Sequence, residues 1–190
     1  MDNFTIGGYG AGLFDKGDVI RMTDAEKLLE SYFAKYEPPM VKLGKALRAK
    51  LRARLPGFCE IVYLYENQKS LVISYSPTEN GYEGLFSLAL YPTELKLFFA
   101  KGASLAKSDP NKLLQGRATV RYVEINAAAD FDRAEIEALV AGALKLAKVS
   151  LVPSAKGSMV IKAEEQKQRA SRTKKAAKPA AAPRKAKAKR

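Results

Sequence analysis

Apolar residues in the first third of the chain recur at the spacing of an amphipathic helix. One residue in every three or four is apolar over about residues 40–55, which predicts a helix with one buried face: Met40, Leu43, Leu47, Leu51 and Leu55. The basic residues of the same segment are expected mostly on the opposite side: Lys42, Lys45, Arg48 and Arg52.

Two further helices are indicated by their start signals. An earlier helix is expected to begin at Thr23, because Thr23 and Glu26 fit a capping box, in which each side chain satisfies a free backbone amide. The last helix is expected over about residues 132–148, with Asp132 as its N-cap and Glu135 completing the box.

Between these helices the pattern changes to short runs of β-branched, aromatic and aliphatic residues, which is typical of strands. The connections are short, so the strands are expected to form an antiparallel meander. One face of the sheet must then pack on the helices. Five strands are predicted, over residues 58–66, 70–76, 84–92, 94–102 and 118–125.

The connection between the last two strands, residues 102–117, is expected to hold one or two helical turns. Asp109 would be the N-cap, Pro110 the first helical residue and Gly116 the residue just after the end. The predicted order is therefore two helices, five strands and a final helix. This order predicts a single α+β domain with helices against one antiparallel sheet.

The charge is concentrated at one end of the chain. The protein has 33 Lys and Arg against 20 Asp and Glu, a formal net charge of +13. Residues 166–190 hold 11 of the basic residues and no acidic residue. They also lack aromatic residues and Ile, Leu, Val and Met, so this segment is expected to be disordered on its own.

These patterns divide the chain into three parts. Residues 1–22 hold five glycines and are expected to form a flexible leader. Residues 23–150 are expected to form the α+β domain, and residues 151–190 a linker followed by the disordered Lys-, Ala- and Pro-rich tail.

The composition excludes several kinds of chemistry. The chain has no His and only one Cys among its 190 residues. This excludes Ser–His or Cys–His catalysis, an imidazole metal ligand, an intrachain disulfide and a Cys-cluster metal site. We expect no cofactor and no enzymatic activity. No apolar run is long enough for a membrane span, and the N-terminus lacks a secretory pattern. A cytoplasmic protein, with association to the nucleoid as an option, is expected.

The segment 81–125 resembles the YdhG-like family, long described as a domain of unknown function. The family pattern is an aromatic-rich hairpin followed by F-x-x-G-x-x-L, D-P, L-x-G and an Arg in the next strand. The matching positions are Phe99, Gly102, Leu105, Asp109, Pro110, Leu114, Gly116 and Arg121. The resemblance covers about residues 23–150.

The resemblance implies a helix-and-sheet sandwich of the frataxin-like kind. One relative in the family has been proposed as an iron chaperone, so a metal-handling protein is the alternative function for this chain. Iron binding by such a fold would need clustered carboxylates, since these are hard oxygen ligands. The candidates are Asp24, Glu26 and Glu30 on the first predicted helix.

A pocket for a small anion is one hypothesis for the folded domain. Arg121 shares a strand face with Val123 and Ile125, and Lys101 and Arg117 flank the same loop. A buried Arg121 would need an anionic partner, and the predicted helical turn after Asp109 would offer free amides. In the alternative, residues 120 and 122 face inward and Arg121 pairs with a surface carboxylate.

Tyr63, Tyr65 and Tyr75 fall at even spacing on the first two predicted strands. They could line a groove or stack on nucleic-acid bases, or pack within the sheet with their hydroxyls at its edge. Cys59 is expected to be a small buried hydrophobic residue, because no His can activate it.

The basic tail carries the strongest functional signal. A long basic arm suits neutralisation of phosphates without readout of bases, and the alternative is a solubilising or targeting tail. We therefore expect a non-enzymatic domain, with a small anionic ligand or a protein as partner, joined to a tail that binds nucleic acid nonspecifically. The tail residues expected to contact phosphates are Lys167, Arg169, Arg172, Lys174, Lys175, Lys178, Arg184, Lys185, Lys187, Lys189 and Arg190.

Overall fold

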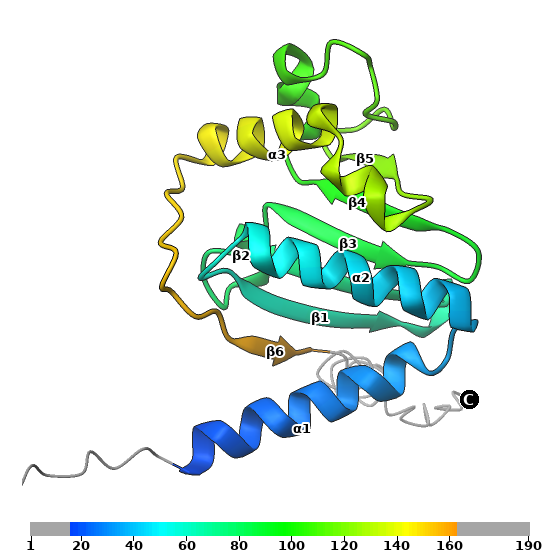
Figure 1. Ribbon diagram of the computed structural model, residues 1–190, viewed down its shortest axis with the longest axis vertical. Coiled ribbons are helices and arrows are strands. Elements are labelled where there is room, and N and C mark those ends of the chain that lie inside the picture. Colours follow the sequence, from blue (N-terminus) through cyan, green and yellow to red (C-terminus); the bar gives the residue numbers. More distant parts are fainter. Residues whose placement is uncertain (1–15, 163–190) are drawn as a thin grey trace, which may run out of the picture.

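The computed structural model describes the backbone of residues 16–162 and the side chains of residues 24–162. Most of the leader and the whole basic tail therefore lie outside the described residues. The α-helices are α1 (Lys16–Phe33), α2 (Pro38–Arg54) and α3 (Ala134–Ala147). The strands are β1 (Cys59–Tyr65), β2 (Ser70–Ser76), β3 (Phe86–Leu90), β4 (Leu95–Phe99), β5 (Arg121–Glu124) and β6 (Met159–Ile161) (Figure 1).

The strands form one sheet in the order β5-β4-β3-β2-β1-β6. The first five make the antiparallel meander that the sequence predicts, with Val62 opposite Ile73 in β1 and β2. The prediction of five strands was wrong, because the sheet has a sixth strand. This strand, β6, pairs parallel to β1, with Met159 opposite Glu60. This strand lies within the segment 151–190, which the sequence assigned to the linker and tail.

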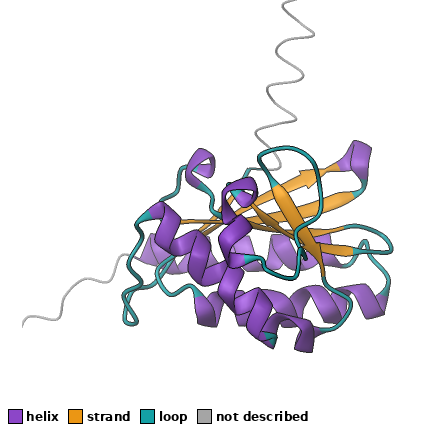
Figure 2. Cartoon of the chain, turned by 90° about the horizontal axis from the view of Figure 1, so that it is seen from above, coloured by secondary structure: helices purple, strands orange, loops and turns teal. Residues whose placement is uncertain are grey.

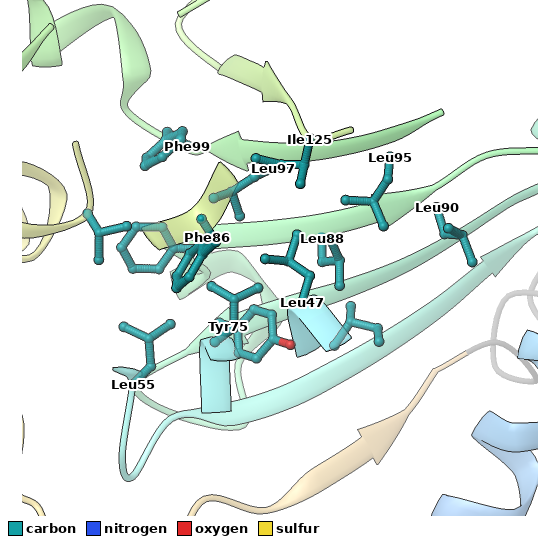
Figure 3. Packing of buried hydrophobic residues seen from close by; sticks show 14 of the residues in the cluster. Leu47, Leu55, Tyr75, Phe86, Leu88, Leu90, Leu95, Leu97, Phe99 and Ile125 are labelled. Carbon is teal, nitrogen blue, oxygen red and sulfur yellow. The ribbon is translucent and has the colours of Figure 1, made fainter. Parts of the chain in front are cut away.

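The three α-helices lie on one side of the sheet (Figure 2). Alternate residues of each strand point toward them, because successive side chains of a strand alternate between its faces. Val62, Ile73, Leu88 and Leu97 all have this orientation and are buried in one cluster with the helix residues. Figure 3 shows Leu88 and Leu97 in this cluster. From α2, Leu47 is fully buried in the same cluster. The α+β architecture expected from the sequence is therefore confirmed.

Two predicted helix starts were wrong. The first helix begins at Lys16, so Thr23 lies inside it and does not cap it. Gly17 is one of the five glycines of the expected leader, but one glycine in a helix costs only about 1 kcal/mol. The last helix has Arg133 as its N-cap, and Asp132 ends the preceding 3-10 helix, residues 128–132. The Asp132 carboxylate instead accepts from Lys50 Nζ, at 2.6 Å.

The helical turns between β4 and β5 lie before Asp109, which the sequence predicted as an N-cap. A 3-10 helix spans Gly102–Ser108 and Asp109 follows its end. The Asp109 carboxylate accepts from the backbone amides of Leu113 and Leu114, at 2.7 and 3.0 Å. Those amides are therefore already satisfied inside the loop, and no helix N-terminus faces a ligand at this point.

Candidate functional site

A cavity of about 430 Å³ lies where the end of α2 meets β1 and the segment before β6. Its walls come from parts of the chain that are far apart in sequence. Glu26 comes from α1, Arg52 from α2, Glu60 from β1, Tyr75 from β2 and Lys156 from the segment that precedes β6. Cavities that hold small ligands have about this volume.

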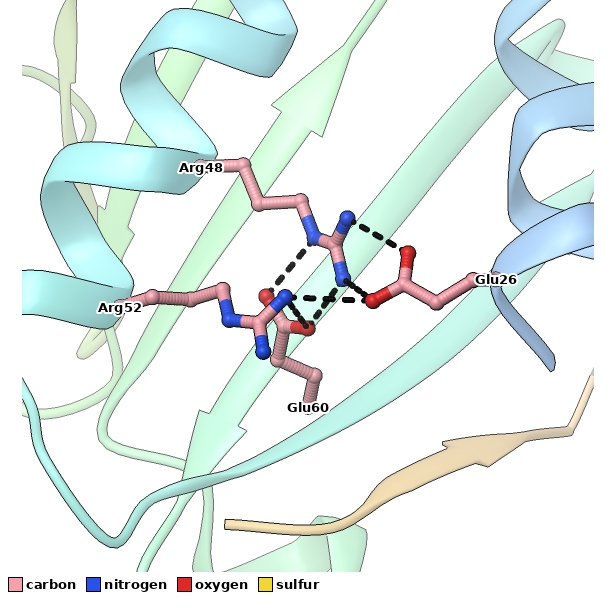
Figure 4. A network of polar contacts seen from close by, with 4 residues as sticks. All are labelled: Glu26, Arg48, Arg52 and Glu60. Carbon is pink, nitrogen blue, oxygen red and sulfur yellow. Dashed lines mark hydrogen bonds and ion pairs between the residues drawn. The ribbon is translucent and has the colours of Figure 1, made fainter. Parts of the chain in front are cut away.

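Beside the cavity, Arg48 is held inside the protein by two carboxylates (Figure 4). Its Nε and Nη2 donate to the two oxygens of Glu60 at 2.9 and 2.6 Å. Its Nη1 and Nη2 also donate to Glu26 at 3.0 and 2.9 Å. Only 8% of Arg48 and 4% of Glu60 is exposed. Such a buried pair is stable because each charge finds several partners in good geometry.

The charges of this network shift the pKa values of its members. Burial alone would lower the pKa of Arg48, but its hydrogen bonds to Glu60 and Glu26 raise it well above the usual value, so it stays charged. The hydrogen bond from Arg48 lowers the pKa of Glu26 against the opposing effect of partial burial. Arg52 adds to this, since its Nη1 donates to Glu26 at 3.1 Å.

Tyr75 ends beside this network. Its side chain is only 1% exposed, and its hydroxyl has no hydrogen-bond partner. Burial, and then the nearby charge of Glu60, raise the pKa of the phenol well above its usual value. The group is therefore a protonated donor at physiological pH.

The charges around the cavity are nearly balanced. Two cations, Arg52 and Lys156, and two carboxylates, Glu26 and Glu60, line it. Arg52 is half-exposed, and only one of its guanidinium nitrogens is a donor to Glu26. Arg52 can therefore offer its other guanidinium donors to a ligand at the mouth of the cavity.

Sequence reasoning placed Arg48 on the solvent side of its helix, and this was wrong. The signal that could have corrected it is Glu60, one acidic residue inside the otherwise apolar run of β1. An acid in such a strand needs a cation from the layer that covers it. Arg48 follows Leu47 directly and lies on the edge of the buried face of α2.

The carboxylates considered for iron are mostly engaged. Glu26 is bound to Arg48 and Arg52, and Glu30 pairs with Lys45, while Asp24 is exposed. Among the residues that the structure describes, no group of three or more His, Cys, Asp or Glu side chains lies together.

The three cations of the expected anion pocket lie around one loop. Arg121 shares the helix-side face of β5 with Val123, and its backbone is opposite Phe99. Lys101 and Arg117 are exposed. The cavity that Lys101 lines between the 3-10 helix and α3 measures only about 10 Å³, scarcely one water molecule.

The tyrosines singled out from the sequence divide between the two faces of the sheet. Tyr75 points into the core, whereas Tyr63 and Tyr65 lie on the other face with their rings stacked at 6.0 Å. Cys59 is buried, as expected, and its Sγ lies 3.3 Å from the Ser158 hydroxyl.

The tail residues named above lie outside the described part of the chain. Within that part, none of the helices has the length and apolar character needed to cross a bilayer.

Comparison with known proteins gives no match: no family model, no curated protein and no solved structure matches the chain. The resemblance to the YdhG-like family therefore stays a prediction.

Proposed function

We propose that the protein binds nucleic acids nonspecifically through its basic segment, residues 166–190, and that the folded domain is a non-enzymatic carrier of that segment. The observation that supports this most strongly is the contrast between the two parts. The tail holds 11 cations and no acid, whereas the rest of the chain holds 22 basic and 20 acidic residues.

The pairing of charges within the domain sharpens this contrast. Helix α2 carries many cations, but carboxylates of other elements neutralise most of them. Lys45 pairs with Glu30, and two further pairs join Lys50 to Asp132 and Arg54 to Glu137, at 2.6 and 2.5 Å. Together with Arg48 and Arg52, these ion pairs leave the surface of α2 with little free positive charge for phosphates.

The tail can bind phosphates without reading sequence. Lys and Arg side chains that contact phosphates release counterions from the nucleic acid, and this release drives binding. If about six to eight of the cations contact phosphates, log K should fall with log salt at a slope of roughly −5 to −7. A fourfold rise in salt then weakens binding by about a thousandfold or more.

Titration of labelled duplexes at two salt concentrations tests this proposal. The full chain is compared with a variant in which the 11 tail cations are replaced by Gln, and each is titrated against one duplex and its scrambled sequence. We expect the variant to lose most of the affinity and the scramble to change little. Unchanged affinity of the variant, or a strong preference between the two duplexes, contradicts the proposal.

For the folded domain, we propose a small anionic ligand in the cavity beside Arg52. The volume of this cavity, the half-exposed Arg52 guanidinium at its mouth and the buried Tyr75 hydroxyl in its lining support this proposal. Thermal melting with a panel of small carboxylates and phosphate esters provides the test. A ligand that raises the melting temperature of the parent should fail to do so for Arg52→Gln. The control Arg133→Gln, at the exposed arginine that precedes α3, should respond like the parent. The iron-chaperone alternative has no supporting contact among the described residues, and we do not propose it.

A further inference from the structure

The sheet face that points away from the helices carries two pairs of aromatic rings. Tyr63 and Tyr65 of β1 stack at 6.0 Å between ring centroids. Phe98 of β4 and Tyr122 of β5 are opposite each other in the register, with centroids 5.3 Å apart. All four side chains are partly exposed. The aromatic face therefore presents rings near both ends of the row of strands β1 to β5.

Small side chains lie between the two pairs. The register places Tyr63 opposite Val72, Val72 opposite Ala89, and Ala89 opposite Lys96. Ala89 is 1% exposed. With strands about 4.8 Å apart, β1 and β4 are separated by about 14 Å, and Phe98 lies two positions from Lys96, the residue of β4 in the row of Tyr63. The two pairs of rings are therefore separate platforms, because the strip between them, with Ala89 and Ser74, is buried.

The aromatic face supplies almost no free positive charge. Its one central cation, Lys96, pairs with Glu94 at 2.7 Å, and Glu124 lies opposite it in β5. The Lys96 ammonium also lies 4.8 Å from the centroid of the Tyr122 ring. A polyanion on this face would need its cations from another part of the protein.

The basic tail leaves the fold at the edge of the same sheet. The backbone amide of Lys162 donates to the carbonyl of Val62 at 2.8 Å. Tyr63, the next residue of β1, carries the first ring of the aromatic face. Lys167 is five positions after Lys162, so an extended chain brings the first tail cation within at most about 18 Å of this point. The tail cations can therefore reach phosphates lying along the aromatic face.

The tail lacks the large apolar side chains that could pack on the rings themselves. Residues 166–190 include no aromatic residue and no Ile, Leu, Val or Met. Flat rings beside a tethered source of cations suit a strand of nucleic acid whose bases are free to stack, since stacking does not depend on sequence. The bases of a duplex are stacked on one another and offer no such face.

We propose that the aromatic face of the sheet binds the bases of single-stranded nucleic acid while the tail holds its phosphates. This inference rests on the proposed function of the tail and adds a preference for single strands. Phe98 and Tyr122 are placed as stacking residues, and the Tyr63–Tyr65 pair forms a second platform.

The test uses the full chain and three labelled probes: a 15-nucleotide oligothymidylate, the same strand with abasic sites in place of the bases, and a duplex. The variants are Phe98→Leu and Tyr122→Leu, which keep an apolar side chain and remove the ring. Phe131→Leu, at a buried phenylalanine on the helix side, is the matched control. Circular dichroism of each variant reports whether the fold is retained.

The parent should bind the oligothymidylate about fivefold or more tightly than the abasic strand, as loss of one stacked base would predict. Phe98→Leu and Tyr122→Leu should each lose this advantage, while their affinity for the duplex and the abasic strand stays that of the parent. Phe131→Leu should bind all three probes like the parent.

Failure of this inference and failure of the tail proposal give different results. If the ring variants bind the oligothymidylate as the parent does, or if the parent binds the abasic strand equally well, the aromatic face is not a base-binding surface, although the tail proposal stands. If the full chain binds none of the probes at low salt, the tail proposal fails and this inference fails with it.

Discussion

Arg48 on α2 and Glu60 on β1 meet through two hydrogen bonds, of 2.9 and 2.6 Å, inside the layer between helix and sheet. The contact fixes the helix against the first strand by charge rather than by apolar packing alone. It also places a full positive and a full negative charge where little water reaches. The stability of the fold therefore depends on both partners being present.

Arg48→Met should destabilise the protein by about 3–5 kcal/mol, because it leaves the Glu60 carboxylate buried without its main partner. Urea unfolding followed by circular dichroism measures the loss. The double variant Arg48→Met with Glu60→Met should be more stable than Arg48→Met alone, since no buried charge is then left unpaired. A double variant less stable than the single one would show that the pair is not coupled in this way.

Acid should weaken the fold partly through Glu26. The pKa of Glu26 is lowered in the folded protein, mainly by its hydrogen bond to Arg48. This contribution is therefore complete above the unfolded pKa of about 4.3 and is lost as the pH falls through the lower folded value. Because Glu26 is more than one third exposed, we expect a contribution of about 1 kcal/mol or less.

Unfolding free energies of the parent and of Glu26→Gln, measured between pH 3 and 7, would reveal this effect. Glu26→Gln should be less stable than the parent at neutral pH, and the difference should shrink toward pH 3. A difference that stays constant over this range would count against a role for the ionised Glu26.

Gly157→Ala should loosen β6. A Cβ at this position would lie 1.7 Å from the carbonyl oxygen of Phe58, so the segment before β6 must move away from β1. The amide of Glu60, which donates to Ser158 at 2.8 Å, should then exchange with solvent about tenfold faster or more. Hydrogen exchange measures this, with exposed Ser154→Ala as control. Equal exchange in Gly157→Ala and Ser154→Ala would refute the expectation.

Leu47→Ala should cost about 2–5 kcal/mol of stability, because Leu47 is fully buried between α2 and the sheet. The matched control is Leu146→Ala on α3, a leucine that is 41% exposed. Its effect should stay within about 0.5 kcal/mol. Thermal or urea unfolding compares the two, and similar losses would mean that α2 is not packed as described.

The strand meander could be predicted because each strand is a local pattern. Runs such as Phe86–Leu90 are apolar except at Ser87 and end at turn residues, so their existence and their order along the chain do not depend on distant contacts. β6 could not be found in this way. Its three residues, Met159–Ile161, become a strand only because β1 offers a free edge beside them.

The site was harder to predict than the fold because it joins residues that are far apart in sequence. Arg48 and Glu60 are 12 positions apart, and Lys156 comes from the far end of the domain. The anion pocket was argued from a loop whose helical turn the structure places before Asp109 instead of after it. A carboxylate that caps its own loop amides has the same sequence signature as a helix N-cap.

The attachment of the tail has a mechanical consequence. β6 runs parallel to β1, so both strands point in one direction, and the amide of Lys162 donates to Val62 just past the end of β6. A pull along that direction loads the hydrogen bonds of β6 together, in shear. A pull outward from the sheet edge breaks them one at a time, beginning at Lys162. The resistance of the domain to force on the tail therefore depends on the direction of the load.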